Sequence, residues 1–371
     1  YVDGHELYND RVYINDGKGN FTAGARIPTK SSASCVTVFD ADGDGDNDVF
    51  RGGQVRFNLY PSIPRSYLLI NDGGVLSDKT SEVAPILLEP GLVKTAAAAD
   101  LNGDKKPELI VTGEWMPVRI FSAKNGNKLE DVTTDYIDAK TNGWWNKIIA
   151  DDIDGDGDID LLAGNLGDNY KFKASVEKPF MVYAKDFDGN GTNDIFLARY
   201  LNDSLVVPIR GRECTSQQMP VIANRFPTFL SFASTDLRGI LGQGIDQALH
   251  YKAFMFSSAI FVNNNNKFTI QPLPVEAQLS TANAFVIRDM NGDGKKDILV
   301  AGNKFDTEVE TTPADASVGV YLENTGGLKF KAVAPTKSGF FVPFNVKDLY
   351  LIGNVVLVAS NNDKLRVFEI R

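Results

Sequence analysis

The sequence contains few of the side chains that common catalytic mechanisms require. Its 371 residues include two histidines, His5 and His250, and two cysteines, Cys35 and Cys214. A Ser/His/Asp or Cys/His site needs a positioned histidine, whereas a lone histidine is more often structural. No glycine cluster is followed by Lys-Ser or Lys-Thr at the spacing of a phosphate-binding loop. We therefore predict that the chain is not an enzyme.

Long apolar runs and an excess of positive charge are also missing. No stretch of about 18 consecutive apolar residues occurs, so no segment is predicted to span a membrane. The 48 Asp and Glu residues outnumber the 38 Lys and Arg residues, which gives a net charge of −10. Nucleic acids bind clusters of Lys and Arg. We therefore exclude a nucleic acid as the partner.

The two cysteines leave the redox compartment open. Cys35 and Cys214 could pair in an oxidising compartment or remain thiols. Cys35 lies in an apolar stretch, which favours a small buried core residue. The chain begins at Tyr1, without Met or a signal peptide, and we interpret it as a mature chain or a piece of a larger protein.

The acidity is concentrated in five short segments that share one pattern. Each reads D-x-[DN]-x-[DN]-x-x-x-[DE] with Gly at position 4, and the segments are DADGDGDND (40–48), DLNGDKKPE (100–108), DIDGDGDID (152–160), DFDGNGTND (186–194) and DMNGDGKKD (289–297). Oxygen ligands on alternate residues of a tight loop suit Ca²⁺, and position 7 varies as expected where only its backbone carbonyl binds. Five such ions would cancel the formal charge of −10. The predicted metal ligands are Asp40, Asp42, Asp44, Asp46, Asp48, Asp100, Asn102, Asp104, Lys106, Glu108, Asp152, Asp154, Asp156, Asp158, Asp160, Asp186, Asp188, Asn190, Thr192, Asp194, Asp289, Asn291, Asp293, Lys295 and Asp297.

The residues after each loop exclude an EF-hand. An EF-hand loop carries Glu at position 12 and is flanked by helices, but these segments run into strand-like pairs such as Val49-Phe50. An Asp/Gly turn without metal is the alternative, and five copies in one register weigh against it. The loops at 100–108 and 289–297 are the weakest candidates, because both contain lysines.

A second element alternates with the loops. It consists of two β-rich runs joined by an Asn/Asp/Gly turn, and copies occur at 11–24, 66–78, 118–132, 259–270 and 318–333. A loop hairpin plus a plain hairpin gives four strands in about 50 residues, which is typical of a propeller blade. We predict an all-β, seven-bladed β-propeller with calcium-binding loops and a partly helical insertion, 201–258, in one blade. The expected ranges are a half blade at 1–30 and blades at 31–85, 90–138, 143–180, 180–275, 280–335 and 340–371.

Two groups of residues are candidate ligand contacts. Arg210, Arg212 and Glu213 lie in the insertion, where Arg side chains could bind carboxylates or acidic sugars or could hold the insertion to its own blade. Trp144 and Trp145 are adjacent on a predicted strand and should point to opposite faces. One is expected in the core, and the other could be an exposed carbohydrate platform.

The loops and their flanks resemble a known family. Each loop is followed by an apolar strand and, in three cases, by AGN or GG, which resembles FG-GAP or VCBS repeats, the blades of integrin-α-like propellers. The segments LYNDRVYINDGKGNFT (7–22), GEWMPVRIF (113–121) and AGNLGDNYKFKAS (163–175) are similar to exported bacterial VCBS-repeat proteins related to the cartilage acidic protein and ASPIC/UnbV group. The resemblance implies a calcium-binding propeller outside the cytoplasm without enzymatic activity. Glu108 departs from the Asp usual at its position.

These observations favour a non-enzymatic calcium-binding propeller that acts as an extracytoplasmic protein- or glycan-binding module. The predicted location is secreted, cell-surface or periplasmic, with structural Ca²⁺ in up to five loops. An alternative is a calcium-dependent, polysaccharide-active enzyme of the lyase type. A part in a larger exported or surface assembly also fits.

Overall fold

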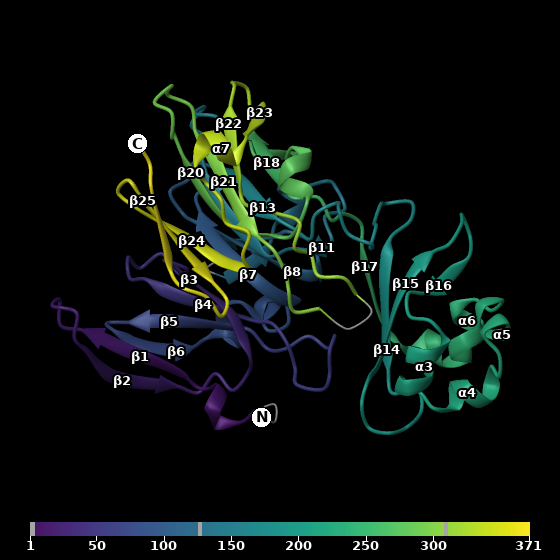
Figure 1. Ribbon diagram of the computed structural model, residues 1–371. Helices are drawn as coiled ribbons and strands as arrows, with labels where there is room; N and C mark the ends of the chain where they lie inside the picture. The colour runs from purple at the N-terminus through teal and green to yellow at the C-terminus, as the bar shows by residue number, and fades with distance from the viewer. Residues whose placement is uncertain (1–3, 125–127, 308–310) are drawn as a thin grey trace. The chain divides into compact units, whose positions relative to one another are not determined.

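The computed structural model describes residues 4–124, 128–307 and 311–371 (Figure 1). Parts of the expected ranges 1–30, 118–132 and 280–335 therefore lie outside the described residues. The described strands form seven antiparallel sheets, which fit the predicted propeller blades. Of the predicted all-β, seven-bladed propeller, the predominance of β-structure is thus confirmed, although short helices are also present.

Two sheets come from the first 80 residues. A hairpin pairs β1 (Asp10–Asn15) with β2 (Phe21–Ile27). The next sheet has the order β3-β4-β5-β6, formed by β3 (Ala33–Phe39), β4 (Asp48–Gly53), β5 (Tyr67–Asp72) and β6 (Val75–Asp78).

A third sheet has the order β10-β9-β8-β11, with β7 also paired to β8. Its strands are β7 (Leu92–Ala99), β8 (Glu108–Met116), β9 (Arg119–Lys124), β10 (Lys128–Asp131) and β11 (Gly143–Trp144). Two later sheets continue the series. They are formed by β20 (Ala282–Arg288), β21 (Asp297–Gly302), β22 (Val320–Asn324) and β23 (Phe330–Val333), and by β24 (Val346–Ile352), β25 (Val355–Ser360) and β26 (Arg366–Glu369).

The strand pairing between residues 147 and 272 differs from the expected blade ranges. One sheet has the order β12-β13-β18-β19 and consists of β12 (Lys147–Asp151), β13 (Asp160–Gly164), β18 (Ala259–Asn264) and β19 (Lys267–Pro272). A separate sheet is inserted between β13 and β18, and it consists of β14 (Phe180–Lys185), β15 (Asp194–Tyr200), β16 (Val206–Pro208) and β17 (Leu249–Ala253). The fourth acidic loop belongs to this inserted sheet, which explains why it follows the third so closely.

The helices are short. The insertion contains α3 (Arg212–Gln218), α4 (Val221–Arg225), α5 (Phe229–Ala233), α6 (Leu237–Leu241) and the 3-10 helix η3 (Gly242–Gln247). The remaining ones are α1 (Thr80–Val83), α2 (Thr133–Tyr136), α7 (Pro335–Ser338) and the 3-10 helices η1 (Glu6–Tyr8), η2 (Pro85–Leu87) and η4 (Val275–Gln278). The predicted partly helical insertion is therefore present.

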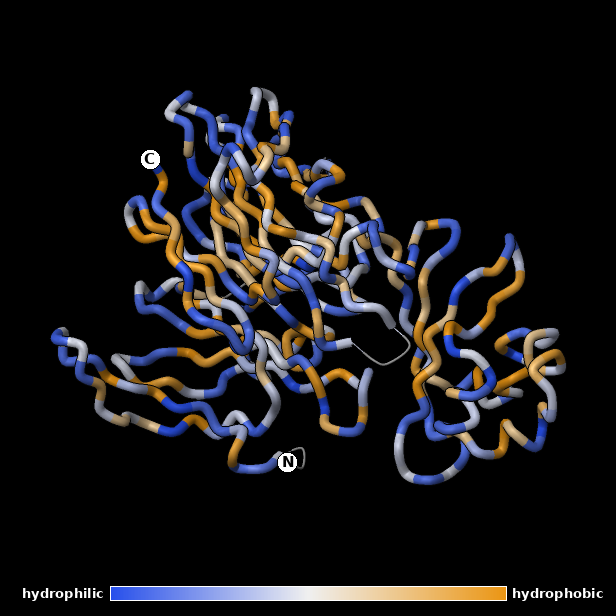
Figure 2. Tube along the Cα trace, in the orientation of Figure 1, coloured by the Kyte–Doolittle hydropathy of each residue, from blue (hydrophilic) through white to orange (hydrophobic). Residues whose placement is uncertain are grey.

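The chain divides into two compact units. The first contains the described residues of Tyr1–Lys94, Phe121–Asp131 and Lys178–Lys252, and the second those of Thr95–Ile120, Val132–Glu177 and Ala253–Arg371. Each has its own apolar clusters, and Figure 2 shows the apolar residues along the strands and the hydrophilic ones at many of the turns. Burial of the apolar strand faces drives the folding of each unit.

Candidate metal-binding loops

Each acidic loop joins the first two strands of a sheet, as the flanking sequence predicts. The loops connect β3 to β4, β7 to β8, β12 to β13, β14 to β15 and β20 to β21. Glycines form the tight turn. In the third loop Gly155 and Gly157 have φ of 82° and 99°, a region that favours glycine.

The carboxylate at position 9 is buried and closes the loop. Asp160 is 1% exposed, and its Oδ2 accepts a hydrogen bond from Ile153 N–H at 3.0 Å. The same bond from position 2 to position 9 recurs in the other loops, from Ala41 to Asp48, Leu101 to Glu108, Phe187 to Asp194 and Met290 to Asp297. The five loops therefore share one geometry, including the one that carries Glu.

The second oxygen of this carboxylate reaches the third strand of the sheet in three cases. Asp160 Oδ1 accepts from Asn263 N–H at 2.8 Å. The equivalent donors are Asn71 N–H to Asp48 and Asn324 N–H to Asp297, both at 2.8 Å. In the inserted sheet, Gln218 Nε2 of α3 lies 3.5 Å from Asp194 Oδ1. Position 9 thus ties the loop to a neighbouring element.

The aspartate at position 1 is oriented by the loop glycines. Asp152 Oδ1 accepts from Gly155 N–H at 2.7 Å, and its Oδ2 accepts from Gly157 N–H at 3.2 Å. Matching bonds reach Asp40, Asp100, Asp186 and Asp289. These bonds fix each carboxylate before any cation binds.

Three loops bring three carboxylates together. In each, oxygens of positions 1, 3 and 9 lie within 4.8 Å of one another, and the groups are Asp40, Asp42 and Asp48; Asp152, Asp154 and Asp160; Asp186, Asp188 and Asp194. These groups could hold metal ions. The other two loops have Asn102 and Asn291 at position 3, which supply an amide oxygen in place of a carboxylate.

Burial and mutual repulsion disfavour the charged form of these carboxylates. Burial raises the pKa of Asp160 to about 6, and the nearby Asp154 and Asp156 contribute to the rise. Burial also raises the pKa of Asp42, Asp154 and Asp194. A bound cation would offset this repulsion, because an opposite charge stabilises the ionised form.

The side chains at position 7 lie outside the three carboxylate groups. The backbone N–H of this position donates to the position-5 side chain, as from Asp158 to Asp156 at 2.9 Å. In the fifth loop Lys295 Nζ also bonds Asp293 Oδ2 at 2.7 Å, so this lysine competes with a cation for Asp293. These positions remain predictions as ligands through their carbonyl oxygens.

The candidate arginines of the insertion bond to the insertion itself. Arg210 donates to Gln218 Oε1 at 3.1 Å, and Arg212 donates to the carbonyls of Ala223 and Phe226 near the end of α4. Glu213 is exposed in the first turn of α3. These contacts stabilise the insertion internally, and both expected roles, ligand binding and attachment of the insertion to its own blade, stay predictions.

The two candidate tryptophans have different surroundings. Trp145 is fully buried and donates to Thr141 O at 2.8 Å. Trp144 is half-buried, with ring centroids 5.1 Å from Trp115, 5.7 Å from Phe172 and 5.6 Å from Phe256. Sequence reasoning missed this aromatic cluster, because its members come from four separate segments. Trp115 also has a φ of 61°, an uncommon backbone state for a bulky residue.

The two histidines and the two cysteines lie in four different elements or their caps. The His250 ring stacks on Tyr183 at 4.0 Å, and burial lowers its pKa. His5 Nδ1 accepts from Leu7 N–H at 3.1 Å at the start of η1. Cys35 and Cys214 are not joined by a disulfide bond. Among the described residues, no helix is long and apolar enough to cross a membrane.

Comparison with known proteins points to the repeat family at part of the chain. The FG-GAP-like repeat family matches residues 4–50 and 100–163, which include the first three acidic loops. No curated protein matches the sequence. The structure is similar to that of the V. cholerae biofilm matrix protein Bap1, with 16% identity and a TM-score of 0.28, over 74% of this chain and 36% of that protein. It is also similar to an Agrocybe aegerita lectin that recognises non-reducing terminal N-acetylglucosamine, with 15% identity and a TM-score of 0.28, over 89% of this chain and 88% of the lectin. This chain thus spans little more than a third of the matrix protein.

Proposed function

We propose that this chain is a calcium-stabilised β-propeller module that binds a protein or a glycan outside the cytoplasm and catalyses no reaction. One observation carries the calcium part. In all five loops a buried position-9 carboxylate accepts a hydrogen bond from its own loop, and in three loops it joins two acidic neighbours within 4.8 Å. This arrangement suits a hard cation.

The donor set fits Ca²⁺. The side chains at positions 1, 3, 5 and 9 are those of Asp, Asn and Glu, which all carry an oxygen that can bind a cation. Ca²⁺ takes six to eight oxygen ligands in flexible geometry. When bound, the ion would neutralise the carboxylates and clamp the turn between two strands. Asp40, Asp42 and Asp48 would hold it in the first loop, and the equivalent residues would do so in the others. The role is structural.

The binding part of the proposal concerns the opposite ends of the sheets. Because the strands are antiparallel, the connections from second to third strands lie away from the acidic loops. Phe172 and Phe256 of the aromatic cluster lie in such a connection, between β13 and β18, and Trp115 lies near the end of β8. Trp144 of β11 pairs with Glu114 of β8 and so lies at the same end. Tyr170 lies against Phe172 at 5.1 Å and is half-buried, which leaves part of its ring available. Partly exposed aromatic rings suit sugar faces.

Calcium dependence is tested by thermal unfolding. We expect a chelator to lower the melting temperature and Ca²⁺ to restore it more effectively than Mg²⁺, because a ligand that binds the folded state stabilises it. An unchanged melting temperature in chelator would contradict the metal assignment.

Ligand binding is tested on a glycan array and by pull-down with an exported-protein extract. We expect Tyr170→Ala to reduce binding, while Phe229→Ala, an exposed aromatic of the insertion, keeps it. The reverse result would move the site to the insertion. Turnover of an acidic polysaccharide that is lost in His250→Ala would overturn the non-enzymatic proposal.

A further inference from the structure

Among its described residues, the second unit has three apolar interfaces between successive sheets, and two of them are completed by a fourth strand. In the first, Phe268 of β19 is buried in a cluster with Leu101, Ile110 and Phe261. Its ring lies 6.0 Å from that of Tyr136 at the end of α2. The short helix before the sheet therefore packs on the fourth strand of that sheet.

The second interface repeats this arrangement. Phe330 of β23, the fourth strand, packs against a buried cluster that contains Ile153 and Ile298. The position-2 residue of an acidic loop contributes to both interfaces, as Leu101 in the first and Ile153 in the second. In both interfaces, a phenylalanine on the fourth strand therefore packs against the neighbouring sheet.

The third interface has the same components except the fourth strand. Met290 at position 2 of the fifth loop and Leu299 of β21 face the β24–β26 sheet in one cluster with Phe368. That sheet has three strands, and β26 pairs with β25 alone among the described residues. One edge of β26 is therefore open.

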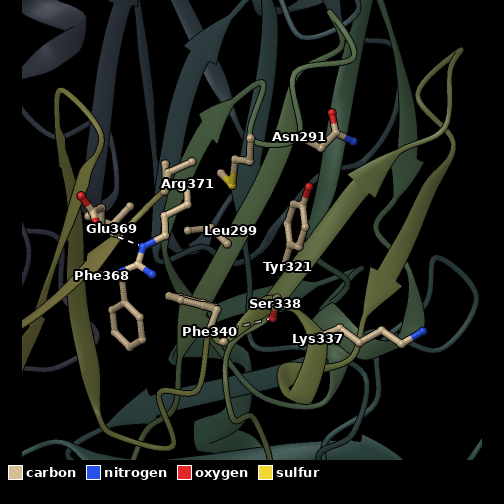
Figure 3. Close-up of a pocket in the computed structure, with 13 residues that line it drawn as sticks. Asn291, Leu299, Tyr321, Lys337, Ser338, Phe340, Phe368, Glu369 and Arg371 are labelled. Carbon is tan, nitrogen blue, oxygen red and sulfur yellow. Dashed lines mark hydrogen bonds and ion pairs between the residues drawn. The ribbon is translucent and has the colours of Figure 1, made fainter.

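A cavity of about 570 Å³ lies at this incomplete interface. Its lining includes Met290, Leu299, Tyr321, Phe340 and Phe368. Figure 3 shows Leu299, Tyr321, Phe340 and Phe368 around one space. Leu299 and Ile110 lie at the same spacing after the first aspartate of their loops, Asp289 and Asp100, and Ile110 packs in one cluster with Phe268. By this equivalence the cavity beside Leu299 corresponds to the position that Phe268 occupies in the first interface. A large apolar side chain fits it.

The rim of the cavity carries one positive charge that is not neutralised. Lys337, at the end of α7, forms no ion pair with any described residue. Arg371, also at the rim, is paired with Glu369 at 3.0 Å. A carboxylate beside the aromatic side chain of an occupant would therefore complement Lys337.

We propose that β26 accepts a fourth strand from a partner protein. The added segment is extended and antiparallel to β26, places an aromatic side chain in the cavity and carries a carboxylate near Lys337. Main-chain hydrogen bonds would supply affinity and the cavity would supply specificity, as in other cases of strand addition. This inference deepens the protein-binding part of the proposed function and rests on it.

A second copy of the chain is a poorer occupant. Its β19 and β23 are already used in their own sheets. Its β2 begins with the exposed Phe21, in the context N-F-T that resembles K-F-T at the start of β19. However, a fourth strand needs a free edge to pair with the third strand of the sheet it joins. In β2 that edge is already paired with β1. The hairpin would have to open first.

The probe is a labelled synthetic peptide with the sequence of residues 265–273, NNKFTIQPL, which forms a fourth strand in this protein. We expect it to bind the full chain in a fluorescence polarisation assay and to bind at least about tenfold more weakly with Phe268→Ala, because the cavity then stays unfilled. A peptide with Lys267→Asp should bind more tightly, and Lys337→Ala in the protein should remove that gain.

Variants of the protein locate the peptide. Leu299→Phe fills the cavity and should weaken binding, whereas Val318→Phe, in a separate apolar groove, should not. Because Leu299→Phe could unfold the sheet, hydrogen exchange in the unmodified protein is the second measurement. The amides of Arg366–Glu369 should become protected when the peptide binds.

Three outcomes would overturn the proposal. They are equal binding of the Phe268→Ala peptide, binding without protection of the β26 amides, and self-association that fills the cavity and is lost in Leu299→Phe. The last would assign the site to a second copy. Failure of peptide binding would leave the calcium response and the aromatic cluster unaffected, so the two proposals fail separately.

Discussion

At the scale of single residues, the position-9 carboxylate has two structural duties. Asp160 accepts one hydrogen bond from its loop and one from the third strand, and it lies beside Asp152 and Asp154 in the proposed ion site. A neutral amide could perform only part of this, because it has one acceptor oxygen.

Asp160→Asn should therefore lower the free energy of unfolding by about 2 kcal/mol, because one buried N–H loses its acceptor. In titration calorimetry, the Asp160→Asn variant should also bind one calcium ion fewer than the unmodified protein. The matched control is Asp158→Asn, at the position whose side chain lies outside the carboxylate group. Equal losses in both variants would argue against the ligand assignment.

His250 should make stability pH-dependent. Burial lowers its pKa in the folded state below the ordinary value of 6.5. The unfolded chain therefore binds a proton first as pH falls, so the contribution to stability is present above about pH 6.5 and is lost below it. At saturating Ca²⁺, the melting temperature should fall between pH 7.5 and pH 5.5, and by less in His250→Phe. An identical pH response in His250→Phe would contradict this assignment.

At the scale of elements, a buried arginine secures the N-terminal hairpin. Arg51 of β4 is 2% exposed, forms an ion pair with Asp10 of β1, and donates to Ser31 Oγ at 2.8 Å. Its guanidinium also lies 5.4 Å from the centre of the Tyr67 ring. A two-stranded hairpin is marginal alone, so these contacts hold β1 and β2 against the β3–β6 sheet.

Arg51→Met should cost about 2 kcal/mol, less than a fully buried pair would, because Asp10 is partly solvated. Urea unfolding measures the loss, and limited proteolysis should cut near β1 and β2 before the rest of the chain. Arg51→Met with Asp10→Asn should recover part of the stability. A double variant as unstable as the sum of the singles would show that the pair is not coupled.

The sequence allowed correct prediction of those elements whose characteristic residues lie close together along the chain. The five loops combine acidic side chains with glycine turns inside nine residues, so their register and flanking strands could be predicted. The pairing of β13 with β18 could not be predicted, because Ala259–Asn264 and Phe180–Lys185 are both apolar strands of similar length. The Trp144 cluster was missed for a related reason, since its rings meet only after several connections fold.

At the scale of the whole molecule, net charge and calcium are linked. The formal charge is −10, and acidic loops occur in both compact units. Without calcium, carboxylates in each loop repel one another, and salt screens this repulsion where the groups are solvated. Bound calcium should remove this repulsion by neutralising the carboxylates directly.

We therefore expect added NaCl to raise the melting temperature of the chelated protein more than that of the calcium-loaded protein. Differential scanning fluorimetry at several salt concentrations measures this difference. Choline chloride should act like NaCl, which excludes specific sodium binding. Equal salt responses with and without calcium would show that loop repulsion does not limit stability.

The segment between β13 and β18, which contains the inserted sheet, has a consequence for the order of folding. The chain leaves the sheet at Gly164 and returns at Ala259, and the two strands then pair as direct neighbours. Each doubling of a connecting loop adds only about 0.6 kcal/mol to the entropy cost of closing it, but it delays the meeting of the two ends. If the intervening segment folds first on its own apolar cluster, its ends are brought closer and the search becomes shorter. The folding rate of the inserted sheet can thus limit the rate at which the β12-β13-β18-β19 sheet forms, although the inserted sheet contributes no strand to that sheet.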